Sequence, residues 1–304
     1  MINKLNLQMM KEEKLQNVGP SKIEIAFQRL GSTSHPAVFL IMGGGAQMIA
    51  WPDKFCEELV RKGVQIIRFD NRDTGLSTHF TEAPIPNFSA VLKGDYSTVS
   101  YTLSDMAADT VGLMDALNFY KVHLVGASMG GMIAQTIAIE YPSRIKSLTS
   151  IMSTTGAPNV GQPDFKLLSH LGEPPYDDRQ RYIDWRLESL KAIGSPGYVF
   201  DDEAAIRTAG LSWDRDHDPL GMTRQAVAVL KSGDRTSKLQ CLQTPALVIH
   251  GDSDKMVNVS GGIATAKAIP NAKLKIFKGL GHGFPKELWN EMTNLIIEHI
   301  KATD

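Results

Sequence analysis

Cysteine is scarce in this chain of 304 residues, and long apolar runs are missing. The two cysteines, Cys56 and Cys241, have no partner at the spacing of a metal site or a redox pair, so we expect two buried free thiols. The first 17 residues carry several charges and lack the apolar stretch of a signal peptide or a membrane span. We therefore expect a cytoplasmic protein that does not bind membranes.

An excess of charge of either sign is also missing. Lysine and arginine number 32, aspartate and glutamate number 33, and the formal net charge is -1. This balance argues against nucleic acid or an anionic membrane surface as a partner. Internal repeats and low-complexity tracts are absent as well, which excludes repeat architectures. With 42% hydrophobic and 21% charged residues, the composition is that of an ordinary enzyme of one or two domains.

Short β-branched or apolar runs alternate with longer helical patterns along most of the chain. Strands that are joined by crossover helices in a mostly parallel sheet produce this alternation. The runs that we interpret as strands are residues 23–27, 38–42, 65–69, 122–126, 147–152, 246–250 and 274–277. The predicted fold class is therefore α/β.

Helical patterns lie between these strands. Pro52 opens a helix that ends near Arg61, and Ser104 can cap a second helix. A third, buried helix is predicted over residues 131–138. The last helix follows Pro285, and its apolar face should dock on the sheet.

The alternation fails between about Thr154 and Gln240. This stretch has helical patterns near 179–193 and 221–231 but no convincing buried strand, so we interpret it as a helical cap inserted into one core. Its aromatic residues can line the roof of a pocket or form a small core of their own. These residues are Phe165, Tyr176, Tyr182, Trp185, Phe200 and Trp213. The predicted division is first core part, cap and second core part, at residues 1–153, 154–240 and 241–304.

The pentapeptide Gly126-Ala127-Ser128-Met129-Gly130 directly follows one of the predicted strands. The pattern G-x-S-x-G places a serine on a cramped turn between a strand and a helix. Side chains two residues to either side would collide there, so both positions are glycine. Because a buried helical pattern follows, the strand, turn and helix are all present. We predict Ser128 as a nucleophile.

A serine hydroxyl needs a base that removes its proton and an acid that orients the base. His282 lies between two glycines in the loop after the last predicted strand, from which it can reach over the sheet edge. The other histidines have plainer contexts, such as His79 in a loop and His250 at a strand end. His282 is therefore the predicted base.

Two carboxylates compete for the position of the acid, Asp252 and Asp254, in the loop after the strand at 246–250. Asp254 is preferred because it lies further along a loop that can lean toward the histidine, whereas Asp252 can cap the turn. No further cluster of carboxylates or histidines supports a metal site here. The order serine, aspartate, histidine is the one expected of a doubly wound hydrolase sheet.

Chemistry at an acyl carbon also needs N–H donors for the developing oxyanion. Met129 supplies one, and the loop Gly43-Gly44-Gly45 should supply the other, with Gly44 as first choice and Gly45 as the alternative. The glycine run also resembles a phosphate cradle, but neither G-K-[ST] nor a spaced G-x-G-x-x-G is present, so no nucleotide is expected. Three consecutive glycines can leave room there for a bulky alcohol group.

These loops together resemble those of the α/β-hydrolase superfamily over nearly the whole chain. Within it, Ala50-Trp51-Pro52-Asp53-Lys54-Phe55 and Arg68-Phe69-Asp70-Asn71-Arg72-Asp73-Thr74-Gly75-Leu76-Ser77 resemble the group of aclacinomycin methylesterase and related carboxylesterases. The resemblance implies an eight-stranded sheet with one antiparallel strand and a helical cap over the active site. It also implies the triad Ser128, Asp254 and His282.

The same resemblance suggests that the segment from Asp70 to Ser77 is structural, with Arg72 bonding to carboxylates and carbonyls beneath the site. Met42 departs from the pattern, because many relatives have histidine before the first glycine. A backbone donor does not depend on that side chain.

The predicted function is hydrolysis of carboxylic esters through an acyl-enzyme on Ser128, without a metal or an organic cofactor. The same triad also serves a C–C bond hydrolase and a cofactor-free perhydrolase or haloperoxidase, and a ligand receptor whose output is cap movement is a further alternative. Epoxide hydrolases and haloalkane dehalogenases use a carboxylate nucleophile, so the serine argues against them. The expected partner is a small-molecule ester, and a homodimer is left open.

Overall fold

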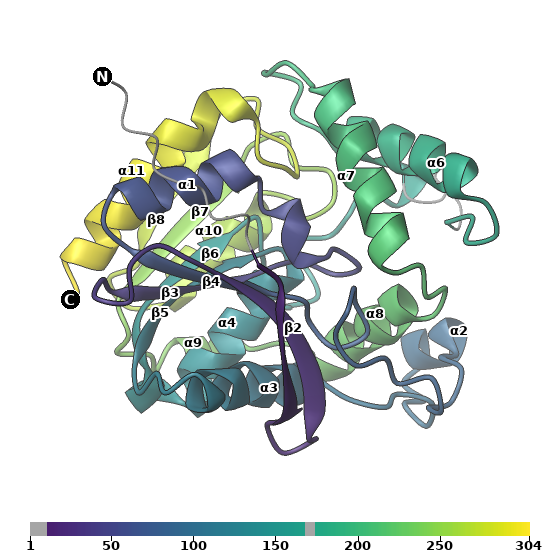
Figure 1. The fold of residues 1–304 in the computed structure, drawn as a ribbon, viewed down its shortest axis with the longest axis horizontal. Helices are drawn as coiled ribbons and strands as arrows, with labels where there is room; N and C mark the ends of the chain where they lie inside the picture. The colour runs from purple at the N-terminus through teal and green to yellow at the C-terminus, as the bar shows by residue number, and fades with distance from the viewer. Residues whose placement is uncertain (1–10, 168–173) are drawn as a thin grey trace.

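The computed structural model describes residues 11–167 and 174–304 of the protein. Eight strands form one sheet in the order β1-β2-β4-β3-β5-β6-β7-β8 (Figure 1). β2 is antiparallel to both of its neighbours, and every other pairing is parallel. The expected sheet, with one antiparallel strand, is confirmed. The strands are β1 (Glu13–Val18), β2 (Ile23–Leu30), β3 (Ala37–Ile41), β4 (Gln65–Phe69), β5 (Val122–Ala127), β6 (Ile145–Ile151), β7 (Ala246–Gly251) and β8 (Lys273–Phe277).

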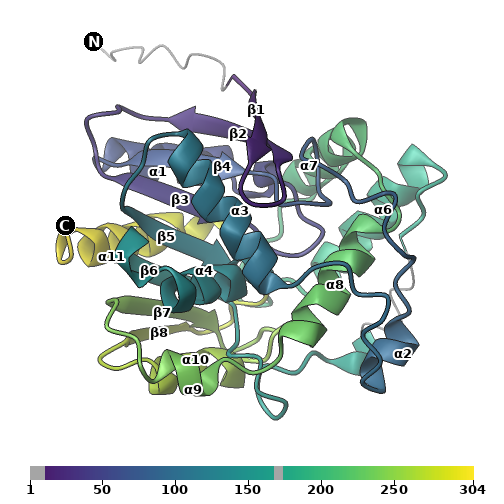
Figure 2. The same ribbon diagram turned by 90° about the horizontal axis from the view of Figure 1, so that it is seen from below.

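Helices cover both faces of this sheet. In β3, Val38 and Leu40 belong to one apolar core and Phe39 and Ile41 to the other, and all four side chains are fully buried. A strand buried on both faces needs a continuous apolar run, which is why this one was recognisable. α1 and α11 cover the first face, and α3 and α4 the second (Figures 1 and 2). The helices outside residues 154–240 are α1 (Asp53–Arg61), α2 (Phe88–Leu92), α3 (Leu103–Ala116), α4 (Met129–Glu140), α10 (Ser260–Ala268) and α11 (Trp289–Lys301), with 3-10 turns at Met48–Ala50, Pro142–Arg144 and Lys286–Leu288.

The sequence prediction left out strand β1. Its sequence, EKLQNV, is mostly polar, and it pairs only with β2 at the edge of the sheet. Edge strands carry charged and polar side chains, so an apolar pattern does not mark them. This segment forms a strand because it pairs with β2 in a hairpin, and its own composition does not favour one.

Two local predictions were wrong. The cap of α3 is Thr102, whose N–H and hydroxyl both donate to the carboxylate of Asp105 at 2.8 Å, so the helix begins before Ser104. Cys241 is exposed because it lies in the surface turn that precedes β7. Cys56 is buried, as expected, and burial raises the pKa of its thiol to about 12.

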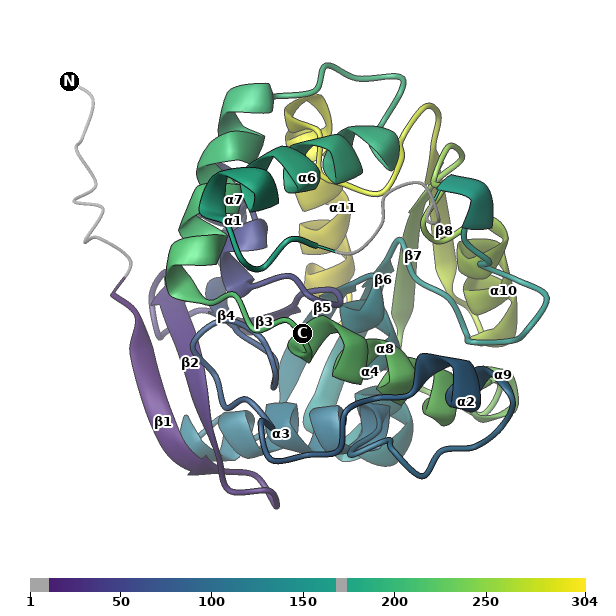
Figure 3. The same ribbon diagram turned by 90° about the vertical axis from the view of Figure 1, so that its right-hand side faces the viewer.

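Residues 154–240 lie between β6 and β7 and are called the inserted segment below. Their described part holds α6 (Arg179–Ala192), α7 (Asp202–Arg215), α8 (Gly221–Ser232) and α9 (Thr236–Leu239), and no strand. The sequence anticipated α6 and α8 but not α7, which buries only small residues, Ala209 and Gly210. α6, α7 and α8 lie on the same side of the sheet, at the right in Figure 1. α6 packs against α7, whereas α8 lies apart from this pair and contacts α2 and α3 (Figure 3). In the described parts of the chain, no helix combines the length and apolar character needed to cross a bilayer.

The inserted segment contacts loops that follow the carboxyl ends of the strands. After β3, the N–H of Gly45 donates to Gln225 on α8 at 2.7 Å. After β8, the carbonyl of Gly279 accepts the N–H of Gly197 at 2.9 Å. The carboxyl edge is where sheets of this class bind ligands, so the inserted segment lies beside the expected site.

Four aromatic rings of the inserted segment lie close to one another. The ring of Tyr182 lies 5.3 Å from that of Trp213 and 6.0 Å from those of Tyr176 and Trp185, measured between centroids. All four side chains are only partly buried, so these contacts do not decide between a pocket roof and a separate core. Phe165 does not join them and is exposed.

Candidate active site

Ser128 occupies the turn between β5 and α4, with φ 55° and ψ -123°. A positive φ is strained for a residue with a side chain, so the surrounding structure must hold it. The carbonyl of Ser128 accepts the hydroxyl of Ser153 at 2.8 Å. A Cβ on Gly126 would lie 2.1 Å from the carbonyl oxygen of Gly130, and one on Gly130 would lie 2.0 Å from that of Ile41. Both positions accept only glycine, as the pentapeptide predicts.

His282 lies in the loop after β8 and meets both residues that were predicted as its partners. Its Nε2 is 3.0 Å from Oγ of Ser128, and its Nδ1 is 2.8 Å from Oδ2 of Asp254. Because an ionised carboxylate only accepts hydrogen bonds, Nδ1 carries the proton and Nε2 is free to accept the serine proton. The carbonyl of Ile193, at the end of α6, accepts the backbone N–H of His282 at 2.8 Å. The inserted segment thus supports the histidine loop.

Asp254 is buried in the loop after β7. Its Oδ1 accepts the N–H groups of Met256 and Val257, both at 2.9 Å. Burial by itself raises the pKa of Asp254, but the electrostatic interaction with the imidazole of His282 and hydrogen bonds from His250, His282 and Val257 outweigh it. The pKa of this carboxyl therefore lies well below its ordinary value, and the group stays ionised beside the imidazole.

The competing carboxylate, Asp252, forms its hydrogen bonds elsewhere. Its Oδ1 accepts the N–H of Gly279 at 2.7 Å and the hydroxyl of Ser253 at 2.8 Å. These bonds connect the loop after β7 with the loop after β8. The structure thus brings Asp254, and not Asp252, to the histidine.

His250 is a neighbour of the acid that sequence reasoning passed over. It is fully buried, and its Nε2 lies 2.8 Å from the carbonyl of Val257 and 3.5 Å from Oδ2 of Asp254. Its Nδ1 has no hydrogen-bond partner in the described residues. Nε2 therefore carries the proton and directs it toward the acid loop. The sequence signal that could have revealed this contact was the spacing of four residues between His250 and Asp254. A histidine near the end of a strand, four residues before an aspartate in the next loop, faces the turn that carries the aspartate.

The glycine loop after β3 forms a tight turn against Ser128. The N–H of Ala46 donates to the carbonyl of Gly43 at 3.3 Å, and Gly45 has φ +64°. This is the arrangement of a type II turn, whose third residue needs a positive φ and hence glycine. A Cβ on Gly43 would lie 2.9 Å from Cβ of Ser128. The first glycine therefore lets the backbone approach the serine.

Gly44 and Met129, the two predicted oxyanion donors, lie on facing sides of this approach. A Cβ on Gly44 would be 3.7 Å from the sulfur of Met129. Neither backbone N–H donates to an acceptor within residues 11–167 and 174–304. The N–H of Gly45, the alternative donor, is already bonded to Oε1 of Gln225. Of the two glycines considered as donors, Gly44 and Gly45, it is therefore Gly44 whose N–H stays available for an oxyanion.

The space beside Gly45 is occupied. A Cβ on this residue would lie 2.7 Å from Cγ and 2.8 Å from the sulfur of Met222, on α8. The room that three glycines were expected to leave for a bulky alcohol group is therefore closed at Gly45 by the methionine. Met222 itself is partly exposed.

The segment from Asp70 to Ser77 links the core to the inserted segment. Asp70 is fully buried, and its Oδ2 lies 2.7 Å from Nη2 of Arg215, at the end of α7. Arg72 donates two hydrogen bonds, of 2.6 and 2.7 Å, to the buried carboxylate of Asp109. The carboxylate bonding expected of Arg72 is confirmed, and the segment also holds α7 in place.

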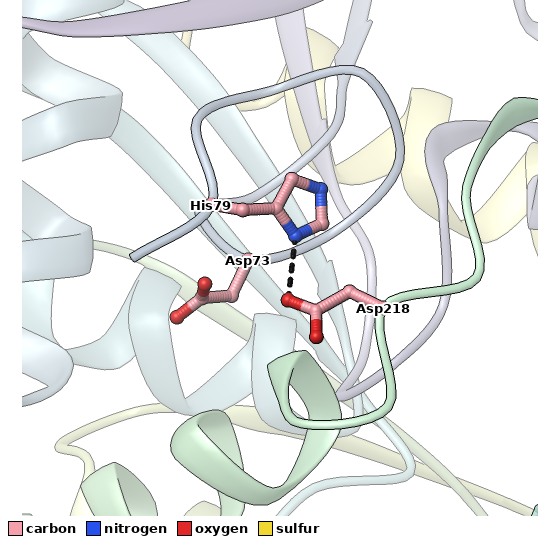
Figure 4. A group of neighbouring side chains, drawn as sticks. All are labelled: Asp73, His79 and Asp218. Carbon is pink, nitrogen blue, oxygen red and sulfur yellow. Dashed lines mark hydrogen bonds and ion pairs between the residues drawn. The ribbon is translucent and has the colours of Figure 1, made fainter. Parts of the chain in front are cut away.

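Asp73, His79 and Asp218 gather three potential metal ligands (Figure 4), with the ligand atoms within 4.8 Å of one another. Nδ1 of His79 lies 2.9 Å from Oδ2 of Asp218. The guanidinium of Arg224 donates to both carboxylates, at 2.8 and 2.9 Å in the case of Asp73. A positive charge already stands between the two acids, so these residues do not fit a cation. They form an ion-pair network between the core and α8.

Comparison with known proteins agrees with this architecture. The family model described as alpha/beta hydrolase fold matches residues 36–287, a range that includes Ser128, Asp254 and His282. The chain therefore belongs to the α/β-hydrolase fold family, as the resemblance implied.

Two curated relatives and one solved structure illustrate the range of this family. The chain is 26% identical to rhodomycin D methylesterase of Streptomyces peucetius over 297 residues, which cover 90% of this chain and 93% of the relative. It is also 26% identical, over 295 residues, to 2-hydroxy-6-oxononadienedioate/2-hydroxy-6-oxononatrienedioate hydrolase 1 of Dechloromonas aromatica, with 93% and 92% covered. The structure of a thermophilic esterase from Thermogutta terrifontis superposes with a TM-score of 0.71 at 23% identity and covers 96% of this chain and 99% of that one. The structural likeness supports the fold.

Proposed function

We propose that this protein is a serine hydrolase that cleaves carboxylic esters through an acyl-enzyme on Ser128. The observation that carries the proposal is the continuous path from Asp254 through His282 to Ser128, with contacts of 2.8 and 3.0 Å. The match to a methylesterase over 90% of the chain supports the ester as the bond that is cleaved.

In the proposed reaction, Oγ of Ser128 attacks the ester carbonyl while Nε2 of His282 takes the hydroxyl proton. Asp254 holds the imidazole and stabilises the imidazolium that forms. The imidazolium then gives its proton to the leaving alcohol, and the acyl group stays on the serine. A water molecule, deprotonated by the same Nε2, attacks this acyl-enzyme and releases the carboxylic acid. Protons balance in both halves of the cycle without an added cofactor.

The tetrahedral intermediates place a negative charge on the former carbonyl oxygen. In this proposal the N–H groups of Gly44 and Met129 stabilise that oxyanion. Support comes from their proximity across the nucleophile turn and from the lack of another acceptor for either group in the described residues. Met42 does not disturb this arrangement, because both donors belong to the backbone.

We also infer that residues 154–240 serve as a cap beside the catalytic edge. The support is that this segment contacts the glycine loop through Gln225 and the histidine loop through Ile193. The cytoplasmic location, the small-molecule ester as partner and the homodimer stay predictions.

A second candidate is a C–C bond hydrolase that uses the same three residues. The Dechloromonas aromatica relative favours it, because the substrates in its name carry a 6-oxo group and no ester. The geometry around Ser128 suits either substrate, since both reactions begin at a carbonyl carbon. The methylesterase relative has the same identity, so the order of preference rests on an assay.

The test is steady-state hydrolysis of p-nitrophenyl esters of short to long acyl chains by the wild type and by Ser128→Ala. We expect ester hydrolysis that disappears in the variant, and the dependence on chain length reports the depth of the acyl pocket. Equal rates for both proteins would contradict Ser128 as the nucleophile. A wild type that hydrolyses no ester but cleaves a 2-hydroxy-6-oxo-dienoate would favour the second candidate.

A further inference from the structure

Gln225 is a fully buried residue of α8. Its side chain connects the glycine loop after β3 with the segment from Asp70 to Ser77. Its Oε1 accepts the N–H of Gly45 at 2.7 Å. Its Nε2 donates to the carbonyl of Arg72 at 2.7 Å and to the hydroxyl of Thr74 at 2.6 Å. The N–H of Gly45 can only donate and the carbonyl of Arg72 can only accept, so the amide has a single orientation.

The bond to Gly45 acts on the central peptide group of the turn. In the turn from Gly43 to Ala46, the central peptide joins Gly44 to Gly45. Type I and type II turns differ by a flip of this central peptide. Glycine tolerates both signs of φ, so two glycines make the flip inexpensive. The hydrogen bond from Gly45 to Gln225 stabilises the type II form, which is the form that the structure shows.

We propose that Gln225 is a positioning residue for the oxyanion donor at Gly44. By bonding to the residue that follows Gly44, Gln225 fixes ψ of Gly44 and the place of the turn beside Ser128, and so holds the N–H of Gly44 in position while charge develops on the substrate oxygen. Gln225 does not touch the reacting atoms. The inference rests on the proposed function, in that it requires an oxyanion formed by attack of Ser128. It gives the inserted segment a part in the chemical step in addition to covering the site.

The experiment compares Gln225→Met, which keeps the volume and removes all three polar contacts, with Gln225→Asn, whose shorter amide cannot span Gly45 and Arg72. The matched control is Gln135→Met. Gln135 is equally buried, on α4, and bonds to Ser150 and Arg235 at 3.3 Å rather than to the turn. Thermal unfolding and circular dichroism identify the variants that fold, and rates refer to folded protein.

The primary readout is the rate at which a fluorophosphonate phosphonylates Ser128, because this step needs the nucleophile and the oxyanion donors but no particular substrate. We expect both Gln225 variants to react about 10- to 100-fold more slowly than the wild type, less than the loss of a donor but typical of a misplaced one. Gln135→Met should stay within about twofold of the wild type, as expected for a site without contact to the turn.

A second readout separates positioning from general damage. A trifluoromethyl ketone forms a charged tetrahedral adduct with Ser128, whereas the matching methyl ketone binds mainly without one. The affinity ratio of the two ketones should fall in the Gln225 variants by the factor lost in kcat/KM for the best ester, with KM changed by less than about twofold. Equal losses for both ketones, or unchanged phosphonylation in both folded Gln225 variants, would overturn the inference.

The outcomes also separate this inference from the proposed function. Slow phosphonylation of the Gln225 variants in a protein that hydrolyses no ester would support the positioning residue and reject the esterase. Ester hydrolysis that depends on Ser128 but not on Gln225 would do the reverse. A wild type whose Ser128 does not react with the fluorophosphonate would overturn both.

Discussion

The guanidinium of Arg224 faces the carboxylate of Asp73 with two hydrogen bonds, from Nε at 2.9 Å and from Nη2 at 2.8 Å. Only 2% of the arginine side chain and none of the aspartate side chain is exposed. The pair connects α8 of the inserted segment with the loop after β4. Because both charges are out of water, Asp73 depends on Arg224 for compensation, whereas Arg224 also pairs with Asp218.

Replacing Arg224 by leucine should lower the free energy of unfolding by about 3–5 kcal/mol, since the carboxylate of Asp73 is then buried without its counter-charge. Urea unfolding of the wild type and the variant measures this. The control is Arg179→Leu, which removes an equally close, two-bond pair with Asp214 at the surface and should change stability little. Similar effects of the two substitutions would contradict the special weight given to the buried pair.

The two carboxylates of the acid loop should differ sharply in activity. Asp254→Asn keeps the shape of the side chain but stabilises the wrong tautomer of His282, so kcat should fall by about 10⁴-fold. Asp252→Asn weakens only the contacts with Gly279 and Ser253 and should lower kcat by less than about tenfold, because exposed contacts contribute little. Kinetics on the best p-nitrophenyl ester decide the matter, and a larger loss for the Asp252 variant would reverse the assignment of the acid.

His79 should make the stability depend on pH. Burial lowers the pKa of His79. The carbonyl of Gly75 and the carboxylates of Asp216 and Asp218 raise this pKa by more than burial lowers it, so the net pKa lies above its ordinary value. Its stabilising contribution is therefore complete below about pH 6.5, the ordinary pKa, and is lost as the pH rises through the raised pKa. The difference in melting temperature between the wild type and His79→Gln should shrink as the pH rises.

The same pH series on His35→Gln provides the control, because His35 is exposed in a loop. Its difference from the wild type should not vary with pH. A difference for His79→Gln that stays constant, or grows toward alkaline pH, would show that its ion pairs with the two carboxylates do not stabilise the fold.

Met222 should limit the size of the group that fits beside the glycine turn. Met222→Ala opens the space next to Gly45, so hydrolysis of a tert-butyl ester should rise relative to the matching methyl ester by about tenfold or more, the worth of one or two methylenes in a pocket. Leu230→Ala, at a partly exposed position of the same helix, is the control and should leave this ratio unchanged. An unchanged ratio in Met222→Ala would remove the methionine from the specificity of the enzyme.

A substitution at Gly45 would answer a different question. Its φ of +64° strains any residue with a Cβ, and the new side chain would collide with Met222. A Gly45→Val variant therefore changes the turn itself as well as the space beside it. Substitution of Met222 tests the size of the site more directly, because this side chain can be shortened without changing the backbone.

The sequence was most informative where a local steric or chemical constraint admits few residues. Gly126 is such a case, because a Cβ there would collide with the backbone of Gly130, only four residues away, within the turn itself. Gly130 is required by a distant neighbour instead, the backbone of Ile41 on β3. Strands buried on both faces were recognisable for a similar reason, since a continuous apolar run marks each of them. The edge strand β1 and the cap of α3 were misjudged, because polar sequences allow several alternatives and a neighbour selects one.

The sequence by itself determined the fold class, the nucleophile turn and the order of serine, acid and histidine. Only the tertiary structure decided that Asp254 meets His282, that Gly44 has the free N–H and that Gln225 holds Gly45. These relations join residues that lie 28 and 180 positions apart in the chain. Sequence patterns report on neighbours within one element, whereas hydrogen bonds between loops form only when packing of the sheet and the inserted segment brings donor and acceptor within about 3 Å.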